Sequence, residues 1–199
     1  SADEVTVVFV IGGPGAGKGT QCSMLAEELD MLHLSAGDLL RAERQRQSSP
    51  FGELINSCIA EGSIVPMQIT ISLLLTAMKE SGRKRFLIDG FPRAIDQGEA
   101  FEKAVCSATA VVFLDCPESV LLDRLLERGK TSGRVDDNAE SIHKRFQVFV
   151  ETSKPVVDHY RAKGTPVLVI DSSGPAKAVC STAKAAIKSV MKVANGAVY

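Results

Sequence analysis

Short runs of apolar, mostly β-branched residues alternate along the chain with longer segments of mixed polarity. Four of these runs, at residues 5–11, 86–88, 110–114 and 166–170, are almost continuously apolar. A strand whose two faces are both buried has such a run, whereas a strand with one wet face alternates apolar and polar residues. The runs therefore predict an α/β fold, in which helices cover both faces of a parallel sheet.

Segments with helical patterns fill the gaps between the apolar runs. They lie at residues 17–29, 37–46, 51–61, 67–79, 95–104, 118–128, 138–162 and 175–193. Residues 136–138 offer several N-caps for the long seventh segment, and Pro155 within it predicts a kink or a break.

No internal repeat or low-complexity linker divides the chain, so we expect one domain over residues 1–199. Residues 35–79 are almost wholly helical and predict a mobile helical insertion. The polar, glycine-containing stretch 128–138 lies between two helices and predicts a short lid. Ligands of parallel sheets bind beyond the carboxyl ends of the strands, and we expect the functional residues to gather there.

Composition narrows the possible partners. The net charge is −1, so nothing in the overall charge attracts nucleic acid or an anionic membrane, and any phosphate must be bound by locally placed Lys and Arg. The five cysteines are scattered, which predicts free thiols in a reducing compartment. No signal peptide is visible and no apolar run has the length of a membrane span. We therefore expect a cytoplasmic monomer.

The most specific motif follows the first apolar run directly. Residues 12–20 read GGPGAGKGT, and a helical pattern begins at once. Glycines allow successive N–H groups to point at phosphate oxygens, the helix N-terminus adds partial positive charge, and Lys18 adds a full charge. The spacing matches a phosphate-binding loop. Gly19 stands where GTPases and most ATPases have Ser or Thr, so the motif points away from both.

Transfer of a phosphoryl group to another phosphate needs positioning and positive charge but no general base. The arginines fit this requirement, and Arg93 follows an Asp-Gly-Phe-Pro turn at a strand end. Asp89 ends an apolar run, where a carboxylate can hold Mg²⁺ directly or through water. The three histidines form no evident constellation, and we interpret each as a surface or core residue.

Five blocks along nearly the whole chain resemble the adenylate kinase and UMP/CMP kinase family. They are GGPGAGKGTQ at 12–21, LSAGDLLR at 34–41, EGSIVP at 61–66, FLIDGFPR at 86–93 and RGKTSGRVDDN at 128–138. The resemblance implies a P-loop kinase fold with a five-stranded parallel sheet flanked by helices, a helical monophosphate-binding insertion at about 35–64 and a short lid at about 129–139 without zinc-binding cysteines. It also implies transfer of the γ-phosphoryl group of Mg-ATP to a nucleoside monophosphate.

The resemblance further implies a role for each matching residue. The catalytic residues would be Lys18, Arg93, Arg128, Arg134 and Arg145. The ATP site would comprise Gly13, Gly15, Ala16, Gly17, Lys18, Gly19, Thr20 and Arg124, the last lying over the base. The monophosphate site would comprise Ser35, Ala36, Arg41, Ile64, Val65, Gly90, Arg93 and Gln97. Asp89 would organise the water of Mg²⁺, with Asp136 and Asp137 in the lid hinge.

Two positions disagree about the acceptor. Gln97 resembles adenylate kinases, which use this amide to read the adenine edge, whereas Ala36 and residues 64–72 resemble UMP/CMP kinases. The Gln97 amide offers paired hydrogen bonds to one base edge, and a site built on such bonds discriminates more strongly than one methyl group does. We therefore expect AMP as the acceptor, with UMP or CMP as the alternative and a nucleotide-binding regulator without turnover as a distant one.

Overall fold

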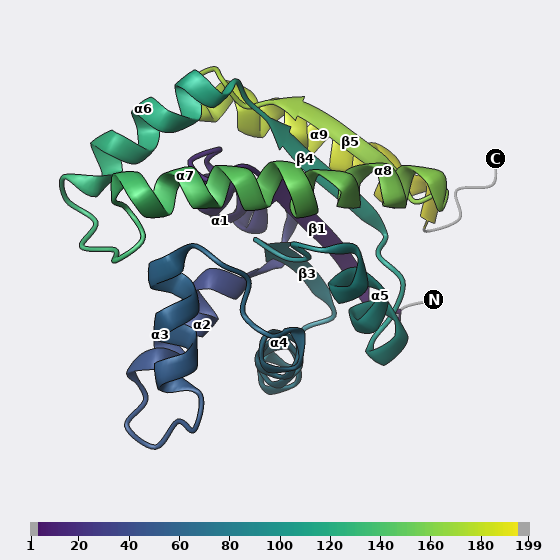
Figure 1. The fold of residues 1–199 in the computed structure, drawn as a ribbon. Coiled ribbons are helices and arrows are strands. Elements are labelled where there is room, and N and C mark those ends of the chain that lie inside the picture. Colours follow the sequence, from purple (N-terminus) through teal and green to yellow (C-terminus); the bar gives the residue numbers. More distant parts are fainter. Residues whose placement is uncertain (1–3, 195–199) are drawn as a thin grey trace.

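The computed structural model describes residues 4–194 as a five-stranded parallel sheet with helices on both faces (Figure 1). The strands lie in the order β2–β3–β1–β4–β5. They are β1 (Thr6–Gly12), β2 (Leu32–Ser35), β3 (Arg85–Asp89), β4 (Ala110–Asp115) and β5 (Val167–Asp171). The predicted fold class is confirmed, and the four apolar runs mark four of the strands to within one or two residues.

The apolar pattern misses one strand, β2. This strand has only four residues, lies at the edge of the sheet, and alternates Leu with His33 and Ser35. Because an edge strand needs no continuous apolar run, the pattern predicts nothing at this position. Only the five-stranded sheet implied by the family resemblance includes it.

The predicted helices are present, with small shifts at their ends. They are α1 (Lys18–Leu29), α2 (Ala36–Gln45), α3 (Gly52–Glu61), α4 (Met67–Ser81), α5 (Ile95–Ala104), α6 (Glu118–Gly129), α7 (Ala139–Val148), α8 (Lys154–Ala162) and α9 (Ala176–Ala194). The long segment predicted at 138–162 is broken by five π-helical residues, η1 (Phe149–Ser153). Pro155, which has no N–H to donate within the helix, lies in the first turn of α8. Asn138 caps α7, as its position predicts.

Two apolar layers hold the sheet between the helices. On one face α1 and α9 contribute residues such as Leu25 and Ile187, and on the other face α4, α5 and α8 contribute residues such as Leu74, Phe101 and Tyr160. In the second layer the ring of Phe9 on β1 packs edge-on against three aromatic rings, among them Phe101 at 5.3 Å between centroids. The core is therefore centred on the middle strand of the sheet.

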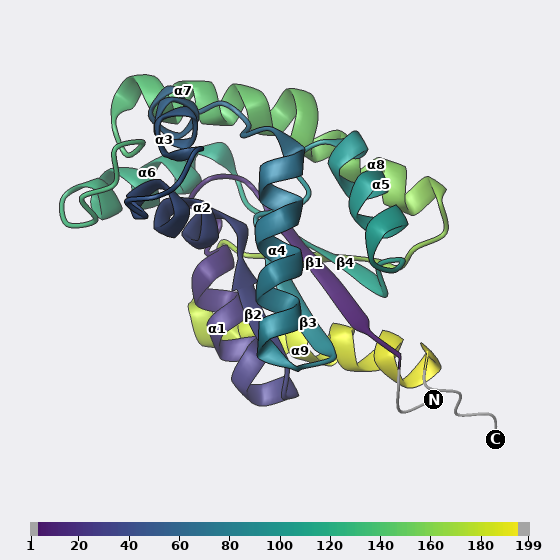
Figure 2. The ribbon, with the colours of Figure 1, turned by 90° about the horizontal axis from the view of Figure 1, so that it is seen from below.

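The sheet brings its carboxyl ends to one edge, toward which α2, α3, α6 and α7 gather (Figure 2). Asp89, the last residue of β3, is in register with Ser35 on one side and with Val10 on the other. The segments predicted as insertion and lid contain α2, α3 and the loop between α6 and α7. That these segments move as separate parts stays a prediction.

The composition also led to expectations about the cysteines and about membrane-spanning helices. All five cysteines are free thiols. Within residues 4–194, no helix combines the length and the apolar character that crossing a bilayer requires.

The aromatic cluster on Phe9 yields a stability prediction. Phe101 is 0% exposed and Phe51, just before α3, is 42% exposed. We expect Phe101→Ala to lower the free energy of unfolding by about 3–5 kcal/mol, because it removes buried apolar surface and leaves a cavity. Phe51→Ala, the matched control, should change it by less than about 1 kcal/mol. Urea denaturation measures both, and equal effects would contradict this description of the core.

Candidate active site

The loop between β1 and α1 leaves the start of the helix open to a ligand. Gly17 caps α1 in a left-handed conformation with φ of 90°, and no side chain accepts from the first N–H groups of the helix. At Gly15 φ is 83°, and a Cβ there would lie 2.8 Å from the carbonyl oxygen of Leu121. Both positions therefore require glycine. The unpaired N–H groups and the helix dipole form an anion site at this point.

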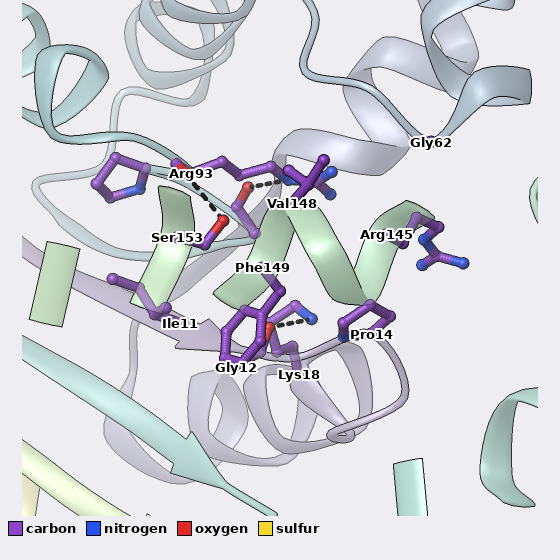
Figure 3. A pocket seen from close by; sticks show the side chains of 12 residues that line it. Ile11, Gly12, Pro14, Lys18, Gly62, Arg93, Arg145, Val148, Phe149 and Ser153 are labelled. Atoms are coloured by element: carbon purple, nitrogen blue, oxygen red, sulfur yellow. Dashed lines mark hydrogen bonds between the residues drawn. The ribbon is translucent and has the colours of Figure 1, made fainter. Parts of the chain in front are cut away.

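Lys18, the first residue of α1, lies folded over the loop. Its Nζ donates hydrogen bonds to the carbonyl oxygens of Gly12 at 3.0 Å and of Gly13 at 3.1 Å (Figure 3). Burial lowers the pKa of Lys18 from 10.5 to about 8, although the nearby Asp89 carboxylate opposes that shift. The ammonium is thus held at the loop by carbonyl dipoles, and an anion placed there would favour its charged form.

One cavity extends from this loop across the carboxyl ends of the strands. Its basic lining consists of Lys18, Arg41, Arg93, Arg124, Arg128, Arg134 and Arg145. The cavity is also lined by six more of the predicted residues and ranges, namely Gly15, Gly17, Gly19–Thr20, Ser35, Asp89 and Gly90. The structure therefore brings all five predicted catalytic residues to one cavity.

Aspartates balance only part of this positive charge. Arg128 makes a two-pronged ion pair with Asp137, with distances of 2.9 and 2.6 Å. Arg145 lies 3.3 Å from Asp136 and equally far from Asp137. Burial raises the pKa of Asp137, but hydrogen bonds from Arg128 and Ser132 more than offset this and hold its pKa below the usual value. Asp136 and Asp137, which were expected in the hinge of the lid, therefore connect the 130–138 loop to Arg128 and Arg145 through ion pairs.

The remaining positive charges are partly desolvated. Burial lowers the pKa of Arg93 and of Arg145, with the neighbouring arginines acting in the same direction and the aspartates against it. Burial and the charges of Arg41 and Arg128 lower the pKa of Arg134. Guanidinium groups stay protonated at such sites. Their mutual repulsion in a partly buried cavity makes this a strong site for a polyanion.

A second pocket adjoins the cavity and shares Arg41, Arg93 and Arg145 with it. Seven of the eight predicted monophosphate-binding residues line this second pocket: Arg41 and Arg93, together with Ala36, Ile64, Val65, Gly90 and Gln97. Gln97 is 4% exposed, and its Oε1 accepts a hydrogen bond from the backbone N–H of Arg93 at 2.8 Å. One end of the amide is therefore already engaged by the protein.

Three predicted ATP-site residues take less direct positions. Gly13 and Ala16 are absent from the lining of the cavity; Gly13 contributes its carbonyl oxygen to Lys18, and Ala16 is 1% exposed in the core. Arg124 does line the cavity, but its guanidinium donates to the carbonyl oxygens of Ser172 at 2.8 Å and of Ser173 at 3.3 Å. Arg124 is thus anchored to the loop that follows β5.

His33 has a partner that the sequence does not indicate. Its Nε2 lies 2.9 Å from Oδ2 of Asp89, the predicted magnesium residue. His33 belongs to β2, the strand that the apolar pattern misses, and the pairing depends on the register of β2 against β3. A second residue missed from the sequence is Ser153 of η1, whose hydroxyl donates to the carbonyl oxygen of Arg93 at 2.9 Å (Figure 3). No sequence signal marks either contact.

Comparison with known proteins agrees with this geometry. The family described as adenylate kinase matches residues 10–165 of the chain. The chain belongs to the adenylate kinase family. It is 52% identical to a UMP-CMP kinase from Lentinula edodes, across 94% of this chain and 88% of the relative. It is 55% identical to a uridylate kinase from Saccharomyces cerevisiae, across 85% of this chain and 84% of the relative. A UMP-CMP kinase from Danio rerio is 51% identical, across 84% and 89%.

As a member of the adenylate kinase family, the chain is a nucleoside monophosphate kinase, which confirms the reaction class expected from the sequence. The expected preference for AMP is not confirmed. These relatives carry the names UMP-CMP kinase and uridylate kinase, which favours the alternative acceptor. At Gln97, the bond from the backbone N–H of Arg93 occupies one of the two lone pairs of the amide oxygen and fixes the orientation of the amide.

The lowered pKa of Lys18 predicts a pH dependence of stability. Between pH about 8 and about 10.5 the unfolded chain carries this proton and the folded chain has lost it, so the free energy of unfolding rises with pH through this window. We expect the wild type to gain stability relative to Lys18→Met as pH rises from about 8 to about 10. Urea denaturation at several pH values measures the difference.

Lys103→Met on the exposed face of α5 corrects for the loss of a lysine as such. Stability curves for wild type and Lys18→Met that stay parallel across this window would show that Lys18 titrates as an ordinary lysine.

Proposed function

We propose that the chain transfers the γ-phosphoryl group of ATP to UMP or CMP. The main support for this transfer reaction is that the cavity and the second pocket have lining residues in common. Arg41, Arg93 and Arg145 line both the cavity beside the phosphate loop and the adjoining pocket. Two phosphate-bearing molecules, one in each site, would meet with their phosphates against the same guanidinium groups. This arrangement supports direct transfer between them.

Six of the seven cationic residues that line the cavity have a part in this proposal. Lys18 and the N–H groups of the loop bind the β- and γ-phosphates of ATP, while Arg41 and Arg93 hold the phosphate of the acceptor. Arg134 and Arg145 stabilise the migrating group, and Arg128 assists them. The acceptor oxygen is already anionic, so no general base is needed. Closure of the 130–138 loop over the cavity would exclude water and suppress hydrolysis of ATP.

Mg²⁺ is the cofactor that we propose for this site. Asp89 is buried and lines the cavity together with Lys18 and Thr20, and its hard carboxylate oxygen suits Mg²⁺ through a bound water. The bond from His33 to Oδ2 leaves Oδ1 for that water. When bound, the ion would neutralise charge on the phosphates of ATP.

The pyrimidine acceptor is supported by the relatives and by the second pocket. The named relatives are about half identical to this chain over most of their length. In the pocket, Ala36 leaves room where a larger residue would stand, and Ile64 and Val65 give an apolar wall for a base. The Gln97 amide keeps its Nε2 donor and a second lone pair on its oxygen, so it can pair with a pyrimidine as well as with adenine.

A coupled assay with ATP and a single monophosphate, run separately for UMP, CMP, AMP and GMP, tests the proposed acceptor. We expect ADP to form with UMP and with CMP, with values of kcat/KM above those for AMP and GMP. Turnover confined to AMP would restore the adenylate kinase interpretation. Absence of turnover with all four would favour a nucleotide-binding regulator.

Replacing Lys18 tests the phosphate loop. We expect Lys18→Met to fold normally and to lower kcat by at least about 100-fold, because it removes a positive charge held where charge develops in the transition state. Circular dichroism checks folding, and Lys103→Met, away from the cavity on α5, should keep wild-type turnover. A wild-type rate for Lys18→Met would refute the role of Lys18.

A further inference from the structure

The lining of the second pocket is mostly apolar away from the arginines, but it includes uncharged polar side chains. Leu40, Ile59, Ile64 and Val65 form apolar parts of its lining. Thr70 of α4 and Gln97 of α5 lie on the lining as well, and α4 packs against α5. A monophosphate whose phosphate is held by the arginines could reach these two residues with its base.

The orientation of the Gln97 amide is fixed by its partner. The backbone N–H of Arg93 is a donor, so the atom 2.8 Å from it must be the carbonyl oxygen of the amide. The Nε2 group therefore points away from Arg93, and within residues 4–194 it donates to no other group. Gln97 presents this pocket with a donor.

The Thr70 hydroxyl is the second polar group, and it can act either as a hydrogen-bond donor or as an acceptor. Thr70 is 5% exposed, yet no hydrogen bond to its hydroxyl exists among the described residues. Two other helical threonines satisfy their hydroxyls by donating to the carbonyl four residues back, namely Thr152 to Val148 at 2.6 Å and Thr182 to Ala178 at 3.2 Å. The Thr70 oxygen is not one of the fully buried atoms that lack a partner, so it is open to the pocket and can bond a ligand there.

Uracil and cytosine differ in hydrogen bonding at ring positions 3 and 4. Uracil has an N–H donor at position 3 and a carbonyl acceptor at position 4, whereas cytosine has an acceptor at position 3 and an amino donor at position 4. A fixed donor or a fixed acceptor suits only one of the two bases at a given position. A hydroxyl can donate to one base and accept from the other by rotating its proton.

We propose that the Thr70 hydroxyl is the specificity-determining group that lets one pocket accept both uracil and cytosine. It reads the edge on which the two bases have opposite polarity, while the Nε2 group of Gln97 donates to an acceptor on the base. This inference rests on the proposed function, and it adds the residue that gives the pocket its double specificity.

Three variants test this role. Thr70→Val keeps the shape of the side chain and removes the hydroxyl, Thr70→Ser keeps the hydroxyl, and Thr76→Val makes the same change on the exposed side of α4. We expect Thr70→Val to lower kcat/KM for UMP and for CMP by about tenfold or more, which corresponds to about 1.4 kcal/mol, mainly through KM for the monophosphate. Thr70→Ser should stay within about threefold of wild type for both, with Thr76→Val unchanged.

The inference would be overturned if Thr70→Val stays within about twofold of wild type, or if its loss is confined to one of the two pyrimidines. Loss of activity in Thr70→Ser as great as in Thr70→Val would also overturn it, because the hydroxyl would then not be the cause. The wild type is assayed first. If it accepts neither UMP nor CMP, the proposed function fails; if it accepts both and Thr70→Val matches it, only the role of Thr70 fails.

Discussion

The concentration of positive charge at the carboxyl edge of the sheet is the constraint on which the rest of the site depends. Seven Lys and Arg side chains line one cavity, which only three carboxylates, from Asp38, Asp89 and Asp136, also line. Partial burial strengthens the repulsion between these cations. The folded chain tolerates the excess because carbonyl oxygens hold Lys18 and Arg124, and aspartates hold Arg128 and Arg145. Phosphate groups are the ligands that complete the balance.

The positive charge lies apart from the residues proposed to select the base. The arginines and the phosphate loop attract any polyphosphate, whatever its base. In the proposed function, selection among bases occurs beyond them, in the pocket that α4 and α5 help to line with Thr70 and Gln97. Arg93 connects the two parts, because it lines the cavity while its backbone N–H orients the Gln97 amide. In this proposal, binding of the phosphate and recognition of the base depend on the same turn after β3.

The sequence predicts those features that local pattern determines. Buried strands have to be apolar, and a loop that wraps a phosphate has to have glycine, so the residues alone locate four strands and the loop at 12–20. Arg93 follows β3 and Arg134 lies in the lid-like loop, so local pattern places both near the site, and these expectations need only the identity of nearby residues. Arg145 lies on α7, and its place in the site was expected from the family resemblance.

The rest depends on contacts between distant segments. β2 is found only from its register with β3, and the pairing of His33 with Asp89 depends on that strand. The preference for AMP rested on the Gln97 amide, and the bond from the backbone of Arg93 that fixes its orientation has no sequence signal. The unpaired state of the Thr70 hydroxyl has no sequence signal, because a helical threonine can either bond its own helix, as Thr152 does, or leave its hydroxyl to other partners.

The central claim is that the cavity aligns two phosphates for direct transfer and supplies no nucleophile of its own. The stereochemical course at phosphorus tests this most directly, with ATP made chiral at the γ-phosphorus by oxygen isotopes and the product analysed after transfer. A single in-line displacement predicts inversion of configuration. Retention would mean two displacements through a phosphorylated side chain, such as Asp89, and would contradict the account.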